Sequence, residues 1–153
     1  MLDEGGRMTI TGDYEPGTWQ WVARQIEEYE ASGGTRANTL RDTGIPIIVV
    51  TMRGAQSGKV RKIGLMRVEH DGSYALVASK GGDPANPAWY ANMTADPRIM
   101  IQDGPAPHPF VVREVDGDER EIWWRRAAEV YPPYLEYAKK AGRVIPVLVA
   151  SPA

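Results

Sequence analysis

The first apolar pattern along the chain has the period of a helix. Apolar side chains recur at the i, i+3 and i+7 spacing of one helix face, with one more tryptophan beside them. They are Trp19, Trp21, Val22, Ile26 and Tyr29. Thr18 is a suitable N-cap, and Gly33 and Gly34 end the pattern, so we expect a helix over residues 18–32. The polar residues 1–17 before it are expected to form a flexible arm.

Short runs with the character of strands follow, and turn residues separate them. The continuous β-branched run at 47–52 is typical of a strand that is buried on both faces. The glycines between 54 and 58 indicate a turn, and Asp71-Gly72 marks a hairpin. We expect strands at about 47–52, 60–69, 74–78, 99–102, 110–115 and 144–150.

Three further helices are indicated, at 88–94, 118–130 and 134–141. Asn86-Pro87 should supply the N-cap and first residue of the first of these helices, and Pro132-Pro133 separates the other two. Consecutive hairpins with few helices favour an antiparallel sheet closed as a barrel and argue against a doubly wound fold. We therefore expect an α+β fold, mainly β, with about six antiparallel strands and flanking helices in one domain over residues 18–153.

Composition removes several classes of function. The 153 residues include no cysteine, which excludes disulfides, thiolate metal sites and cysteine nucleophiles. The two histidines, His70 and His108, are too far apart for a short-spaced zinc pair, so no metal is expected. A net charge of −2 argues against a nucleic-acid partner. No apolar leader and no apolar run of spanning length is present, so we expect a cytoplasmic protein.

The turn at 53–62 is the first candidate for chemistry. Two glycines and a serine lie between two strands, and four cations surround them. Successive N–H groups of a glycine turn can converge on an anion, and the cations would add charge. An ordinary hairpin with solvated cations remains the alternative. The residues concerned are Arg53, Gly54, Ser57, Gly58, Lys59, Arg61 and Lys62.

Three later motifs are weaker when each is taken alone. Ser79-Lys80-Gly81-Gly82 follows a strand and brings a hydroxyl and a cation to a flexible loop. Trp89 lies in the first turn of a short helix and is most economically explained by packing in the core. Tyr131, Tyr134 and Tyr137 fall within one 120° arc of a helix, either as an apolar stripe or as three hydroxyl groups that face a pocket.

The order of these motifs resembles the deazaflavin-dependent nitroreductases of actinobacteria. The resemblance covers residues 45–149, most of the chain. The motifs are Gly54-x-x-Ser57-Gly58-x-x-Arg61, Ser79-Lys80-Gly81-Gly82, Asn86-Pro87-x-Trp89-Tyr90-x-Asn92, Tyr131-Pro132-x-Tyr134 and Ile145-Pro146-Val147.

This resemblance implies a split β-barrel related to flavin mononucleotide (FMN)-binding oxidoreductases. It also implies an enzyme that uses reduced coenzyme F-420, a 5-deazaflavin, to deliver hydride to a quinone or nitro compound. Catalytic or substrate-lining roles would fall on Ser79, Tyr131, Tyr134 and Tyr137. Cofactor contacts would come from Arg53, Gly54, Ser57, Gly58, Lys59, Arg61, Lys62, Ile63, Gly64, Leu65, Met66, Ala78, Ser79, Lys80, Gly81 and Trp89.

Several alternatives stay open at this point. The same barrel could bind FMN, or it could carry a deazaflavin without catalysis. Met66 stands where nitroimidazole-activating members carry a pocket tyrosine, which argues against prodrug reduction more than against cofactor binding. The chain could be a monomer or a homodimer. The first helix could touch a membrane surface, but Glu27, Glu28 and Glu30 on its polar face would be repelled by anionic lipid, so packing is favoured.

Overall fold

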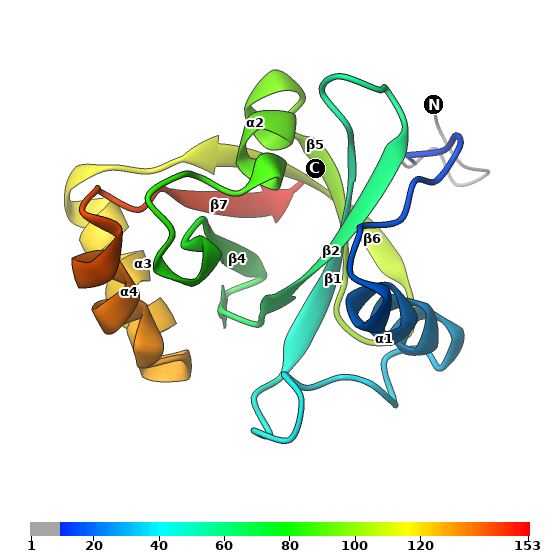
Figure 1. Ribbon diagram of the computed structural model, residues 1–153, viewed down its shortest axis with the longest axis horizontal. Helices are drawn as coiled ribbons and strands as arrows, with labels where there is room; N and C mark the ends of the chain where they lie inside the picture. The colour runs from blue at the N-terminus through cyan, green and yellow to red at the C-terminus, as the bar shows by residue number, and fades with distance from the viewer. Residues whose placement is uncertain (1–9) are drawn as a thin grey trace.

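The computed structural model describes residues 10–153 as a β-barrel with helices against its outside (Figure 1). Residues 1–9 of the expected arm lie outside the described residues. The elements are α1 (Gln20–Ala31), β1 (Ile47–Arg53), β2 (Val60–Met66), β3 (Glu69–His70), β4 (Ser73–Val77), the 3-10 turn η1 (Lys80–Gly82), α2 (Ala88–Ala95), β5 (Arg98–Gln102), β6 (Pro107–Glu114), α3 (Gly117–Val130), α4 (Pro133–Ala141) and β7 (Val147–Pro152).

One bent chain segment closes the sheet. The strand order is β2-β1-β5-β6-β7-β4-β3, and every neighbouring pair is antiparallel. β2 and β3 stand at opposite ends of this order, yet only Arg67 and Val68 separate them in the chain. The Arg67 N–H donates to the Pro46 carbonyl at 2.9 Å, and the Val68 carbonyl accepts from the Ala75 N–H at 2.9 Å. The expected single strand at 60–69 is therefore two short strands with a bend, and the antiparallel barrel is confirmed.

Alternation along the strands divides the apolar residues between two sides of the barrel wall. Ile48, Val50 and Met52 of β1 belong to one buried cluster with alternate residues of β4, β5, β6 and β7, and this cluster fills the barrel. Ile47 and Val49 point outward and pack beneath α1. β1 is therefore buried on both faces, as its continuous apolar sequence predicts.

Helix α1 covers the outside of β1, but only part of the apolar helix face that we expected is buried there. Ile26 and Tyr29 are buried there, and the Tyr29 hydroxyl donates to the Gln102 carbonyl at 3.2 Å and accepts from the Gly104 N–H at 3.0 Å. The prediction that Thr18 caps the helix was wrong, because Trp19 occupies the N-cap and no side chain caps the first turn. Trp19 lies just before the helix with 67% of its surface exposed, so it does not share the buried face.

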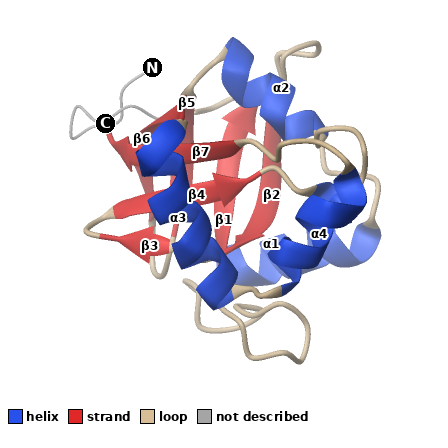
Figure 2. Cartoon of the chain, turned by 90° about the vertical axis from the view of Figure 1, so that its left-hand side faces the viewer, coloured by secondary structure: helices blue, strands red, loops and turns tan. Residues whose placement is uncertain are grey.

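Helices α3 and α4 pack on the opposite side, across the outer faces of β4 and β7 (Figure 2). Trp123 and Ala127 of α3 are buried there, and Gly142 ends α4 in the left-handed conformation at φ 63°, as expected. Asn86 does not cap α2, because Pro87 is the N-cap residue. The Asn86 side-chain oxygen instead accepts from Arg143 at 2.7 Å, which ties the loop before α2 to the loop before β7.

Candidate functional site

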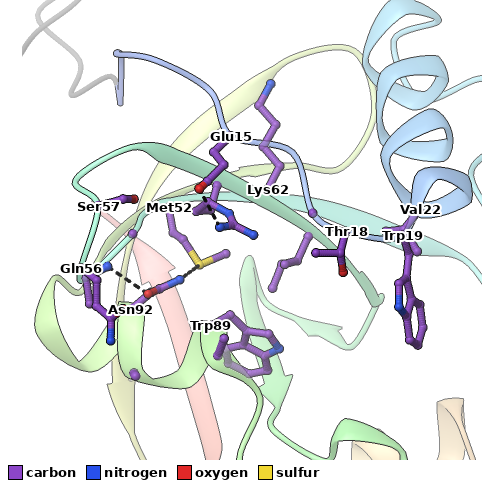
Figure 3. A pocket seen from close by; sticks show the side chains of 17 residues that line it. Glu15, Thr18, Trp19, Val22, Met52, Gln56, Ser57, Lys62, Trp89 and Asn92 are labelled. Carbon is purple, nitrogen blue, oxygen red and sulfur yellow. Dashed lines mark hydrogen bonds and ion pairs between the residues drawn. The ribbon is translucent and has the colours of Figure 1, made fainter.

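A cavity of about 640 Å³ lies at one end of the barrel. Three parts of the chain form it: the segment that precedes α1, the β1–β2 hairpin and the first turn of α2. Figure 3 shows these side chains around the cavity. The lining residues are Glu15, Gly17, Thr18, Trp19, Val22, Met52, Gly54, Ala55, Gln56, Ser57, Arg61, Lys62, Ile63, Ala88, Trp89, Ala91 and Asn92.

The hairpin turn is tightly hydrogen-bonded within itself. The Gly54 N–H donates to the Lys59 carbonyl at 2.8 Å, and the Gly58 N–H donates to the Gly54 carbonyl at 3.0 Å. The Ser57 hydroxyl accepts from the Lys59 N–H at 3.1 Å and would lie only 2.8 Å from a Cβ at position 54, so a side chain at that position would force the hydroxyl to move. These bonds use most of the donors that we expected to form an anion-binding nest.

Asn92 of α2 fixes the turn from across the cavity. Its side-chain oxygen accepts from the Ala55 N–H at 3.0 Å, and its amide nitrogen lies 3.7 Å from the Met52 sulfur (Figure 3). Within the described part of the chain, this leaves the backbone N–H groups of Gln56 and Ser57 as the turn's donors without a protein partner. Two donors at the cavity rim can still bind one anion.

The four cations around the turn differ in what they contact. Arg61 lines the cavity, and its guanidinium lies 3.3 Å from a carboxylate oxygen of Glu15. Arg53 is directed along the turn, where it donates to the Gly58 carbonyl at 2.8 Å. Lys62 pairs with Glu30 of α1 at 2.7 Å, whereas Lys59 is exposed and has no ion pair with any residue of 10–153. Of the two that line the cavity, Arg61 has the longer ion pair and is therefore the better placed to meet a ligand.

An apolar wall faces these polar groups. Met52 is fully buried at the end of β1, directly opposite Arg61 in the β1–β2 register. Trp89 of α2 is 9% exposed and packs on the barrel cluster, with Ile63 beside it. The cavity thus combines an apolar surface for a ring with a polar end for an anion, which is the usual character of a cofactor site.

Ten predicted cofactor residues do not line this cavity. Gly64, Leu65 and Met66 continue along β2 away from it, while Ala78 to Gly81 follow β4. Lys80 and Gly81 both have left-handed backbone angles, with φ of 48° and 64°. They lead to Gly82, where a Cβ would lie 3.2 Å from the Cα of Tyr137, so this loop packs directly on α4. The three remaining residues, Arg53, Gly58 and Lys59, lie on the turn outside the cavity.

Arg143 holds the loop at 78–86 in place. Its guanidinium donates to the carbonyl oxygens of Ala78, Ser79, Asp83 and Ala85 and to the side chain of Asn86, at distances of 2.7 to 3.3 Å. A planar group with five N–H donors suits this convergence of carbonyl oxygens, and lysine could not reproduce it. The backbone around Ser79 is therefore fixed from the loop before β7.

The three tyrosines come together, but outside the cavity. Tyr134 is 2% exposed, and its ring centroid lies 5.0 Å from that of Tyr131 and 6.3 Å from that of Tyr137. The hydroxyl groups of Tyr131 and Tyr137 form a hydrogen bond of 3.0 Å. Burial, with this bond, raises the pKa of Tyr131 to about 12, and burial also raises the pKa of Tyr134. The phenols of Tyr131 and Tyr134 therefore stay protonated at neutral pH.

Met66, at the end of β2, packs against the larger apolar cluster of which Tyr134 is a member. The positions that the resemblance assigns to the substrate therefore gather around α4, with the Ser79 loop beside them. The burial of Tyr134 favours the packing alternative for that residue. The catalytic roles of Ser79, Tyr131, Tyr134 and Tyr137 stay predictions.

An antiparallel barrel whose end holds a cavity with an apolar wall, a cation and backbone donors fits a split-barrel oxidoreductase that binds a flavin or deazaflavin. A family model described as F420H(2)-dependent quinone reductase matches residues 21–152. The chain therefore belongs to the F420H(2)-dependent quinone reductase family.

Individual relatives agree with this assignment. An F420H(2)-dependent quinone reductase of Mycobacterium tuberculosis is 32% identical over 107 residues, which are 68% of this chain and 72% of that protein. The solved structure of an F420-H2 dependent reductase is 52% identical with a TM-score of 0.66, and the match covers 69% of this chain and 94% of that one. A second solved chain, described as a domain-swapped dimer, is 47% identical with a TM-score of 0.68 over 86% of this chain and 98% of that one.

These findings confirm the resemblance, the split-barrel fold and the prediction of an F-420-dependent reductase. The protein is an oxidoreductase whose cofactor is coenzyme F-420, and the FMN alternative finds no support. None of the described helices is both long enough and apolar enough to cross a bilayer. Within residues 10–153, no three acidic or histidine side chains gather as a metal ion would require.

The side of the cavity that the N-terminal segment forms was not predicted from the sequence. Glu15, Thr18 and Trp19 were assigned to an arm and a helix start, because nothing local in the sequence indicates what lies across from them. For two other lining residues, a local sequence pattern indicated their position. Met52 shares the period-2 face of Ile48 and Val50, and Asn92 stands one helical turn after Ala88, next to Trp89.

Proposed function

We propose that the cavity at the end of the barrel binds F-420 and that the acceptor of the reduced cofactor is a quinone. The observation that supports the binding site is the cavity's division into an apolar wall and a polar end that contains Arg61. Its volume of about 640 Å³ falls in the range of roughly 300–1,000 Å³ that small-molecule sites occupy. The name of the family supports a quinone as the acceptor.

Each side of the cavity has a separate task in this proposal. Arg61 and the N–H groups of Gln56 and Ser57 bind the cofactor's phosphate, because charged and backbone donors together suit an anion. Met52 and Trp89 pack against the ring and exclude water from that face. When bound, F-420 supplies the hydride chemistry, and the protein binds, orients and shields.

Strand β2 connects this cavity to the tyrosine cluster. Arg61 lies in the cavity and Met66 packs against the apolar cluster that contains Tyr134, and at ~3.4 Å per residue the two are roughly 17 Å apart along the strand. We infer that the acceptor approaches from the Met66 end. There the Tyr131 hydroxyl, whose pKa is raised to about 12 and which is hydrogen-bonded to the Tyr137 hydroxyl, can donate a hydrogen bond to a quinone oxygen.

Arg61→Ala tests the position of the cofactor. We expect F-420 to bind about two- to fivefold more weakly, the loss expected for one partly exposed charge contact. The loss should be greater at low salt, because dissolved ions screen the attraction. Lys59→Ala is the matched control, since it removes the same charge from the same turn outside the cavity. Adding Lys59→Ala to Arg61→Ala should change little further, and unchanged affinity in Arg61→Ala would refute the placement.

The acceptor is tested by anaerobic oxidation of reduced F-420 with a panel of quinones and nitro compounds. We expect higher kcat/KM for quinones. Turnover with nitro compounds alone would overturn the quinone assignment while leaving the cofactor site intact.

The exposed tryptophans at the start of α1 raise the question of membrane contact. Trp19 and Trp21 stack with ring centroids 6.3 Å apart, and both are exposed. Trp19 also lines the cavity, so we propose that it covers the cofactor rather than entering lipid. Co-sedimentation with anionic liposomes that depends on Trp19 and Trp21 would refute this.

The domain-swapped relative supports a homodimer, which light scattering can test.

A further inference from the structure

The segment at 11–19, here called the strap, runs along the free edge of β2 before it crosses the cavity. The Val60 N–H donates to the Asp13 carbonyl at 2.8 Å, and the Val60 carbonyl accepts from the Glu15 N–H at 2.9 Å. Tyr14 lies between them as a parallel bridge partner of Val60. The backbone of Glu15 is therefore fixed to the strand one residue before Arg61.

Two more contacts hold the strap. Arg53 donates to the Thr11 carbonyl at 3.0 Å, and the Lys62 ammonium lies 5.0 Å from the centre of the Tyr14 ring. With its backbone held on both sides, Glu15 directs its carboxylate to the Arg61 guanidinium at 3.3 Å (Figure 3). Both side chains line the cavity, and each keeps about a third of its surface exposed, 35% for Arg61 and 37% for Glu15.

We propose that Glu15 is a specificity-determining residue of the cofactor site, as a tethered carboxylate that competes with an anionic ligand for Arg61. The proposal rests on the proposed function, in which Arg61 binds the cofactor's phosphate. A guanidinium bonds a carboxylate and a phosphate through the same N–H groups. A phosphate that reaches Arg61 must therefore displace Glu15 or bind beside a like charge.

The other cations cannot replace Arg61 in this competition. Lys62 is held by Glu30 at 2.7 Å, Arg53 is engaged by two carbonyl oxygens, and Lys59 does not line the cavity. Glu15 thus sets how strongly anionic a ligand must be to bind at this end of the cavity. A neutral quinone does not compete for Arg61, so Glu15 affects the cofactor and not the acceptor.

The experiment compares Glu15→Gln with Asp13→Asn. Both variants remove one negative charge from the same strap, but Asp13 is exposed and lines no part of the cavity. We expect Glu15→Gln to bind F-420 about two- to fivefold more tightly, as for one partly exposed ion pair, and Asp13→Asn to bind as the parent does. The gain should shrink at high salt, and the KM for a quinone should not change.

Fluorescence titration of the full chain with F-420 measures the affinity, and thermal melting confirms that each variant is folded. Equal or weaker binding by Glu15→Gln, or equal gains in both variants, would overturn the proposal. Arg61→Ala separates this failure from failure of the proposed function. If Arg61→Ala weakens binding while Glu15→Gln has no effect, only the competition is refuted. If Arg61→Ala leaves the affinity unchanged, the phosphate site itself is refuted.

Discussion

Replacing Tyr134 first by phenylalanine and then by alanine separates packing from chemistry at the centre of the tyrosine cluster. The ring is 2% exposed and lies against Trp124, Tyr131 and Tyr137, with ring centroids 5.0 to 6.3 Å apart. Its hydroxyl takes part in none of the hydrogen bonds found in the described part of the chain. The ring and the hydroxyl therefore make separable contributions.

The two variants should differ widely in stability. Tyr134→Ala removes a whole buried ring and should lower the free energy of unfolding by about 3–5 kcal/mol. Tyr134→Phe removes only a hydroxyl that has no protein partner, so its effect should stay within about 1 kcal/mol of zero. At roughly 2–4 °C per kcal/mol for a chain of this size, the alanine variant should melt on the order of 10 °C below the phenylalanine variant.

Chemical denaturation gives the free energies, and steady-state oxidation of reduced F-420 gives the rates. If Tyr134 only packs, Tyr134→Phe retains the parent kcat, and the proton donors are Tyr131 and Tyr137. A large fall in kcat for a Tyr134→Phe enzyme with unchanged F-420 affinity would refute this reasoning, because it would show that the hydroxyl meets the acceptor.

Two further predictions concern the surroundings of this cluster. Arg143→Lys should lower the free energy of unfolding by about 1–3 kcal/mol, because lysine cannot serve the carbonyl oxygens of the loop at 78–86; an unchanged urea midpoint would contradict the role assigned to Arg143. The pKa of Tyr131 is raised from 10.0 to about 12, so the unfolded chain loses this proton first, and the free energy of unfolding should fall between pH 10 and pH 12. Melting curves should show a shallower fall in Tyr131→Phe, whereas an identical fall would assign the effect to Tyr74 and Tyr134, whose pKa values burial also raises.

The strands could be predicted because their signals are local. The β-branched run at 47–52, the Asp71-Gly72 hairpin and the Pro132-Pro133 break each act over a few residues, and each appears where expected. The bend at Arg67 and Val68 could not be predicted in this way. It depends on hydrogen bonds to Pro46 and Ala75, which lie in different parts of the sequence, and Arg67 and Val68 themselves suit a continuous strand.

The candidate site was predictable to the extent that a single turn forms it. Gly54, Ser57 and Arg61 were recognised because glycine, hydroxyl and cation occur together within one hairpin. Asn92 shares a helix face with Ala88, which is a local signal, but its hydrogen bond to Ala55 spans 37 residues. The contact of Glu15 with Arg61 spans 46 residues and follows from tertiary structure alone.

The bent segment at 60–70 also restricts how the length of this chain can vary. Its first part is in register with β1 and its last part with β4, so both ends are held by different partners. Inserting or deleting one residue between them would exchange inward and outward side chains on at least one of the two sides. Natural length variation in relatives should therefore be absent from this segment and should accumulate in the loop at 32–46, which joins α1 to β1 and has no such double constraint.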